Sequence, residues 1–191
     1  MKRNTLLLLS LAVMMAASIA SKAQSREVMI LYNNAFVHQK EYRPDEAMKC
    51  LRLAIQLDST FVPAYNLMGY IYEDAYVQYD SALMTYRKIL DIDSNYSKAY
   101  VNIGHIFFLM KKYDEALKCN EKAVAVDPTY GDAYFNIGWI YNIRGDLEKS
   151  IEYIFRAAQF GSREAKEFLD RNGYNEDLQE DYSDGFNDDI E

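Results

Sequence analysis

Histidine, cysteine and proline are scarce in this chain of 191 residues, which contains two, two and three of them. The HExxH and CxxC metal-binding patterns and the Gly-rich phosphate loops are all missing. His38 and His105 lie 67 residues apart, whereas a zinc site needs several ligands close together. The sequence therefore predicts no metal, no cofactor and no catalytic residues, with paired carboxylates as the open alternative.

An excess of basic residues is also missing, because the formal net charge is −8. Binding to nucleic acid needs a basic stripe, so the charge argues against that class of partner. The last 16 residues, from Glu176, contain eight acidic residues and no Lys or Arg. We predict that residues 174–191 form a disordered, solvated acidic tail. The alternative is a tail that docks onto a basic partner or folds back over the chain.

Long apolar runs are confined to the N-terminus. Lys2 and Arg3 precede an apolar run from Leu6 to Ala17, which is too short to span a bilayer comfortably. This pattern predicts a signal peptide over residues 1–23, cleaved after Ala23 or after Ala20. We expect a mature chain that is exported to a bacterial periplasm and that does not bind a membrane. An uncleaved membrane anchor is the alternative.

What the sequence does contain is a repeated phrase. Three near-copies of it are Ala64–Tyr72, Ala99–Phe107 and Ala133–Tyr141, and their glycines at 69, 104 and 138 are 35 and 34 residues apart. Each copy is followed by a second phrase that contains Ala or Ser, and this second phrase recurs with the same period. A fixed period in the mid-thirties, built from two helical phrases, predicts an array of stacked helix pairs.

These phrases resemble the tetratricopeptide repeat family, in which an aromatic, a small residue and a second aromatic mark the first helix. The resemblance implies an all-α, right-handed α-α superhelical solenoid of about four helix pairs plus a C-terminal capping helix. The implied boundaries are a repeat domain over 24–173, with repeats at about 28–61, 62–96, 97–130 and 131–164, and a capping helix over 162–172.

Three local expectations follow from the residues. Gly69, Gly104 and Gly138 should allow the second helix of each pair to lie close to the first. The turns that begin at Asp58, Asp93 and Asp127 should supply side chains that cap the next helix, each followed by an aromatic residue. Repeat two should have a longer turn near residues 75–78, because it contains one extra residue.

Cys50 and Cys119 occupy equivalent positions two repeats apart. Stacked helices lie roughly 10 Å from one another, and a disulfide needs Cα atoms within about 7 Å. We therefore predict that these residues do not form a disulfide and that both pack partly between helices.

The resemblance also implies a function. First helices of such repeats line a concave groove, so we expect a non-catalytic scaffold that binds a peptide or protein segment of unknown identity in an aromatic groove. The alternative is a carrier or sensor for a small apolar or sugar-like ligand in the same groove. Trp139 is the leading candidate for a binding hot spot. The implied groove residues are Tyr32, Phe36, Asn66, Tyr70, Lys98, His105, Phe108, Phe135, Trp139 and Asn142.

Overall fold

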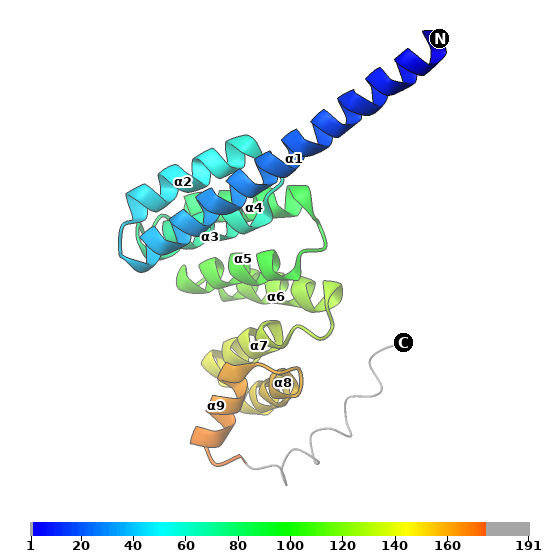
Figure 1. Cartoon of the computed structure of the whole chain (residues 1–191). Helices are drawn as coiled ribbons and strands as arrows, with labels where there is room; N and C mark the ends of the chain where they lie inside the picture. Colours follow the sequence, from blue (N-terminus) through cyan, green and yellow to red (C-terminus); the bar gives the residue numbers. More distant parts are fainter. Residues whose placement is uncertain (1, 175–191) are drawn as a thin grey trace. The chain divides into compact units, whose positions relative to one another are not determined.

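The repeated phrases form antiparallel helix pairs in the computed structural model, which describes the backbone of residues 2–174 and the side chains of residues 21–174 (Figure 1). No strand occurs in this part of the chain, so the predicted all-α class is confirmed. The chain divides into two units, residues 1–88 and 89–191, and α4 contributes to both. The acidic tail lies outside the described residues.

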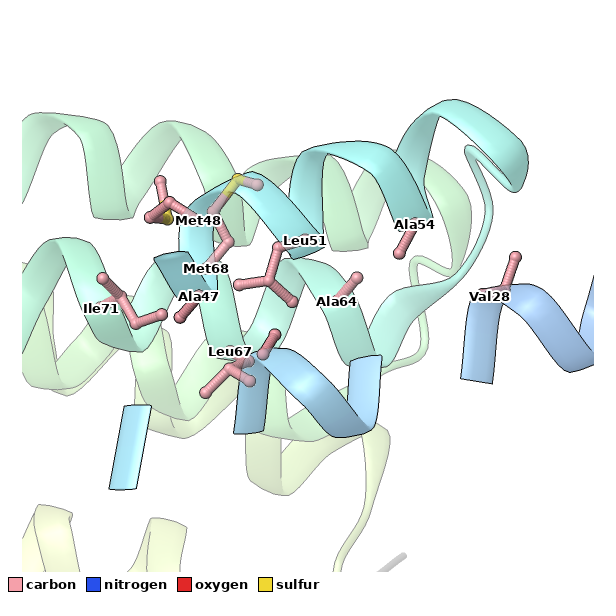
Figure 2. Close-up of a cluster of buried hydrophobic side chains, with 10 residues drawn as sticks. Val28, Ala47, Met48, Leu51, Ala54, Ala64, Leu67, Met68 and Ile71 are labelled. Atoms are coloured by element: carbon pink, nitrogen blue, oxygen red, sulfur yellow. The ribbon is translucent and has the colours of Figure 1, made fainter. Parts of the chain in front are cut away.

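The first unit contains α1 (Lys2–Lys40), α2 (Pro44–Leu57), α3 (Val62–Asp74) and most of α4 (Tyr79–Ile92). Its core forms where α1, α2 and α3 meet, around Leu51, Met68 and Ile71 (Figure 2). α1 is one continuous helix of 39 residues, so it includes the residues of the predicted signal peptide from Lys2 onward. Among the described helices, none is both long enough and apolar enough to cross a membrane.

The second unit contains α5 (Ser97–Leu109), α6 (Tyr113–Val126), α7 (Gly131–Arg144), α8 (Leu147–Gln159) and α9 (Arg163–Arg171). α5 packs on α6, α6 on α7, and α7 on α8. α9 packs on both α7 and α8 and buries Ala165 and Leu169. The expected C-terminal capping helix is therefore present, and its N-cap is Ser162.

Glycine permits the close approach within each pair. A Cβ at Gly138 would lie 2.9 Å from the backbone oxygen of Ser150, and one at Gly104 would lie 2.7 Å from Asn120 Nδ2. Both distances are shorter than a relaxed contact. The expectation about these glycines is confirmed, and it explains why residues of poor helix propensity lie inside helices.

The turns between repeats correct one expectation. Asp58, Asp93 and Asp127 do not cap the helices that follow, because α3, α5 and α7 begin without a side-chain cap. Each carboxylate instead accepts a hydrogen bond from the backbone N–H two residues on, at 2.9–3.0 Å. Because the carboxylate makes its hydrogen bond within this turn, it does not cap the N–H groups of the helix that follows. The aromatic residue that follows the turn occupies the N-cap position.

A tyrosine in each of these helices locks the preceding turn. The hydroxyl groups of Tyr65, Tyr100 and Tyr134 each donate to a backbone oxygen six residues earlier, at 3.1, 3.2 and 3.1 Å. The same residues mark the first-helix pattern in the sequence. They therefore have a conformational role that their spacing alone did not indicate.

The turns within the pairs share a left-handed residue. Tyr42, Val77, Lys111 and Gly145 all have φ between 52° and 80°, a conformation that only glycine adopts without strain. In repeat two the turn is longer, as predicted, and the Gln78 N–H donates to the Tyr72 carbonyl oxygen at 2.7 Å.

Both cysteines are half-buried and neither forms a disulfide, in agreement with the prediction. Cys50 packs beside the core of the first unit.

Candidate functional site

The second unit contains a cavity of about 270 Å³ between α5 and α7. Four of its lining residues belong to the groove predicted from the sequence: His105 and Phe108 of α5, and Phe135 and Trp139 of α7. The others complete its floor and edge, and they are Gly104, Asn120, Asn136 and Ile140.

Repetition brings these residues together. His105 and Trp139 both follow the glycine of their helix, so they occupy the same helical position one repeat apart. Because α5 and α7 lie against one another, residues at equivalent positions line the same space. Gly104 and Ile140 were not among the predicted groove residues, although they adjoin His105 and Trp139 in the sequence.

Two asparagines form the floor of the cavity. Asn120 of α6 is 1% exposed, and its Nδ2 donates to the Ala116 carbonyl oxygen at 2.8 Å. Its Oδ1 accepts a hydrogen bond from Asn136 Nδ2 at 3.3 Å. The floor is therefore polar, and its buried amide is satisfied within the protein.

Aromatic rings form the walls. Phe135 and Trp139 stack with centroids 6.2 Å apart and an angle of 24° between their planes. Phe108 meets Tyr113 edge-on at 5.6 Å, which fixes the Phe108 ring. Trp139 is 36% exposed despite these neighbours. A large aromatic surface is thus held in place and remains open to a ligand.

α9 covers the other side of this stacked pair. Phe168 meets Trp139 edge-on at 6.0 Å. A second cavity, of about 240 Å³, is lined by Phe135, Trp139 and residues of α9 and its C-cap. Trp139 and Phe135 therefore separate two adjacent cavities. The capping helix fills part of the face that the sequence assigned to a ligand.

The predicted residues of the first unit are arranged differently. Tyr70 is 42% exposed and lines an open cavity of about 680 Å³ with Lys40, Tyr42 and Asp74 among others. Burial and the neighbouring Asp74 carboxylate raise the pKa of Tyr70. Its phenol therefore stays protonated at neutral pH.

The remaining first-unit candidates, Tyr32, Phe36 and Asn66, do not line this cavity. Tyr32 packs edge-on against Phe61 at 5.6 Å, beside the core. Phe36 is 42% exposed, and the Lys40 ammonium lies 4.8 Å from its ring centroid. Asn66 is half-buried.

Two candidates of the second unit lie outside the cavity between α5 and α7. Lys98 is exposed near the start of α5, and Asn142 is half-buried near the end of α7. Val101, also in α5, is 8% exposed and belongs to the core. Among the residues that the structure describes, no three His, Cys, Asp or Glu side chains are placed to hold a metal ion.

Comparison with known proteins identifies the repeat type. Models of the tetratricopeptide repeat match residues 97–130 and 119–152. Protein bimA of Emericella nidulans is 35% identical over 88 residues, which are 46% of this chain and 10% of that protein. Anaphase-promoting complex subunit 3 of Schizosaccharomyces pombe is 29% identical over 90 residues, or 47% and 13% of the two chains. The chain thus matches only about a tenth of these relatives' length.

Solved structures share the fold at low identity. The structure of MamA has a TM-score of 0.60 and 23% identity, and the match covers 78% of this chain and 86% of that one. PilF of Pseudomonas aeruginosa gives 0.66 and 16%, with 85% and 76% covered. The first repeat domain of Spaghetti (RPAP3), bound to the HSP90 peptide SRMEEVD, gives 0.56 and 20%, with 63% and 95% covered. The two model matches thus place tetratricopeptide repeats within residues 97–152, and the solved structures show the same fold, an α-α solenoid with a C-terminal helix.

Proposed function

We propose that this protein is a non-catalytic scaffold that binds a protein segment in the cavity between α5 and α7, with Phe135 and Trp139 as the main contacts. One observation carries the proposal: the stacked Phe135–Trp139 pair borders the cavity and leaves Trp139 36% exposed. Trp and Tyr residues in partly enclosed sites dominate the binding energy of many protein interfaces.

The size of the cavity favours a side chain over a whole small molecule. Pockets for drug-sized ligands measure about 300–1,000 Å³, and this cavity measures about 270 Å³. A second cavity adjoins it across the same two rings. A peptide could place one apolar side chain in each cavity, whereas a compact ligand would use only one. The small-ligand carrier therefore remains the second candidate.

The RPAP3 domain shows that a protein of this fold binds a peptide. Its peptide, SRMEEVD, is acidic at the C-terminal end. None of the residues around the cavity described here is Lys or Arg, so a clamp for a terminal carboxylate is not assembled there. We propose that apolar side chains of the partner provide the recognition instead.

Affinity capture from an envelope extract tests the proposal. We expect Trp139→Ala and Phe135→Ala to lose proteins that the wild type retains. Leu147→Ala is the matched control, because Leu147 is an apolar residue of the same unit, 62% exposed, that lies outside the cavity. Recovery of the same proteins by all three variants and the wild type would disprove the site assignment.

We also propose that the protein acts outside the cytoplasm, in a bacterial periplasm, after removal of residues 1–23. The support is the order of charges, apolar run and small residues at the N-terminus. Export would place the cavity in the compartment from which the extract above is prepared.

A further inference from the structure

Two positions that are buried in later first helices of the array are exposed in α1. In α3 and α7, the residue five places before the internal glycine and the residue two places after it are at most 1% exposed. These residues are Ala64 and Ile71 in α3, and Ala133 and Ile140 in α7. α2 packs on α3, and α6 packs on α7. The second helix of the preceding repeat therefore covers this face of each first helix.

α1 has the same apolar face without the cover. Ala35 stands where α3 and α7 have glycine, so Ile30 and Val37 occupy the two equivalent positions. Ile30 is 53% exposed and Val37 is 50% exposed, and no described residue buries them. Met29 and Phe36, one residue before each of them, are also exposed. A contiguous apolar patch of this kind is typical of an interaction surface.

The residues around this patch are symmetric along the chain. Arg26 lies four residues before Ile30, and Glu41 lies four residues after Val37. Steps of four and seven residues return to nearly the same side of a helix, so these four residues form one stripe. The stripe continues to Glu41, because the Glu41 N–H still donates to the Val37 carbonyl oxygen at 3.0 Å.

This symmetry makes the stripe complementary to itself in the opposite direction. In an antiparallel pair of α1 helices, Ile30 of one copy lies at the level of Val37 of the partner subunit. Arg26 then lies at the level of Glu41 of the partner subunit, whereas a parallel pair would bring like charges together. Asn33 and Asn34 are exposed at the centre of the stripe. Each amide group can donate and accept, so it can bond to an identical group.

The other charges of this segment leave the balance unchanged. Glu27 and Lys40 lie on opposite flanks of the stripe, so each end of the pair gains one anion and one cation. The segment from Arg26 to Glu41 therefore has a formal charge of zero, although the whole chain has −8. Glu41 also pairs with Arg43 of its own chain, and its side chain stays half exposed.

We propose that two copies of this chain associate through an antiparallel pair of α1 helices, with Ile30 packed on Val37 of the partner subunit. This surface belongs to the first unit, so the inference goes beyond the function proposed for the cavity between α5 and α7. The stripe is about 22 Å long. A contact of one helix with its copy is smaller than a standard interface of about 1,600 Å². We therefore expect a weak, reversible dimer.

Sedimentation equilibrium of the full chain, over a range of concentrations, measures the Kd of the dimer. We expect Ile30→Asp and Val37→Asp each to raise the Kd at least about tenfold, because each places an unpaired carboxylate in the contact. The control is Met84→Asp, which changes an apolar residue of α4 that is 68% exposed and should leave the Kd unchanged. Circular dichroism should show the same helix content in all three variants.

A charge exchange tests the antiparallel direction. Arg26→Glu and Glu41→Arg should each raise the Kd, because each brings like charges to the same level of the pair. The chain that carries both changes should recover most of the wild-type affinity, since opposite charges meet again. Such recovery is the sign of a direct pairwise contact.

Three results would overturn the inference. One is a monomer at every concentration. Another is a dimer whose Kd is unchanged by Ile30→Asp and Arg26→Glu, because another surface, such as the apolar run from Leu6 to Ala17, would then hold the copies together. The third is a doubly exchanged chain that binds no better than either single variant. None of these results concerns capture through Trp139, so the proposed function is tested separately.

Discussion

At the scale of single residues, the repeat depends on glycines, whose lack of a Cβ atom allows two helices to pack closely. At Gly138 a Cβ would meet the Ser150 carbonyl oxygen at 2.9 Å and Ile154 Cγ1 at 2.8 Å. The backbone oxygen cannot turn away as a flexible side chain can. At Gly104 the nearest atom is Asn120 Nδ2, at the end of a side chain. A side chain at Gly138 should therefore cost more stability than one at Gly104.

We expect Gly138→Ala to destabilise the protein by about 1–3 kcal/mol, because overpacking of a close contact outweighs the better helix propensity of alanine. Gly104→Ala should cost less. The measurement is the midpoint of denaturant unfolding for both variants. If Gly138→Ala raises the midpoint, as propensity alone would require, the helices can separate without cost.

Buried tyrosines predict a loss of stability at high pH. Burial raises the pKa of Tyr86 far above its ordinary value of 10.0, and Glu73 raises it further. The folded state then keeps a proton that the unfolded state releases above pH 10. The contribution of Tyr86 to the free energy of unfolding should therefore be constant below that pH and fall as the pH rises above it.

Tyr86→Phe should reduce this alkaline loss, since phenylalanine cannot ionise. The check is the denaturant midpoint near neutrality and at several pH values above 10. Tyr42→Phe is the control, because Tyr42 is 93% exposed. An identical pH profile for Tyr86→Phe and the wild type would show that Tyr86 ionises without unfolding.

At the scale of helices, the C-terminal cap combines a sealing face with a well-formed start. α9 buries Ala165 and Leu169 and places Phe168 against Trp139. Ser162, which is 3% exposed, begins it by accepting a hydrogen bond from the Ala165 N–H at 3.5 Å. The start of α9 thus influences both the stability of the second unit and the position of the Trp139 ring.

We expect Ser162→Ala to cost about 1 kcal/mol, the usual loss when an N-cap oxygen is removed. Ser162→Thr keeps the hydroxyl and should retain most of the stability. Thermal unfolding monitored by circular dichroism, together with the Trp139 emission, measures both effects. A fully stable Ser162→Ala variant would mean that packing alone holds α9 in place.

At the scale of the whole molecule, the period of the sequence was enough to predict the helix pairs, because each pair repeats the same packing problem with the same residue types. The site was harder to predict. His105, Phe108, Phe135 and Trp139 could be selected by their helical position. Asn120 lies in a second helix and faces inward only because Gly104 leaves room for it.

The partial covering of Trp139 by α9 could not be predicted either, because it also depends on how helices pack against one another. The resemblance implied a helix that caps the array, but the residue that Phe168 meets depends on how this helix is rotated. That rotation follows from the packing of α7, α8 and α9, which no short pattern encodes.

The export proposal is also tested on the whole chain. Expression with the native N-terminus in a bacterial host should yield a periplasmic protein whose mass corresponds to a start at Gln24, or at Ser21 if cleavage follows Ala20. Intact-mass spectrometry of the fractions decides between them. An unprocessed chain that begins at Met1 and sediments with membranes would favour the anchor alternative.

The tyrosine that locks each inter-repeat turn has a consequence for engineering. Tyr65, Tyr100 and Tyr134 each hold the turn just before their own helix by a hydrogen bond. The residues that determine how one repeat joins the next therefore lie close together in the sequence. A duplicated stretch of residues 93–126 would contain its own copy of this tyrosine and its turn. The protein could therefore be lengthened by one repeat at a time without redesign of the turns between repeats.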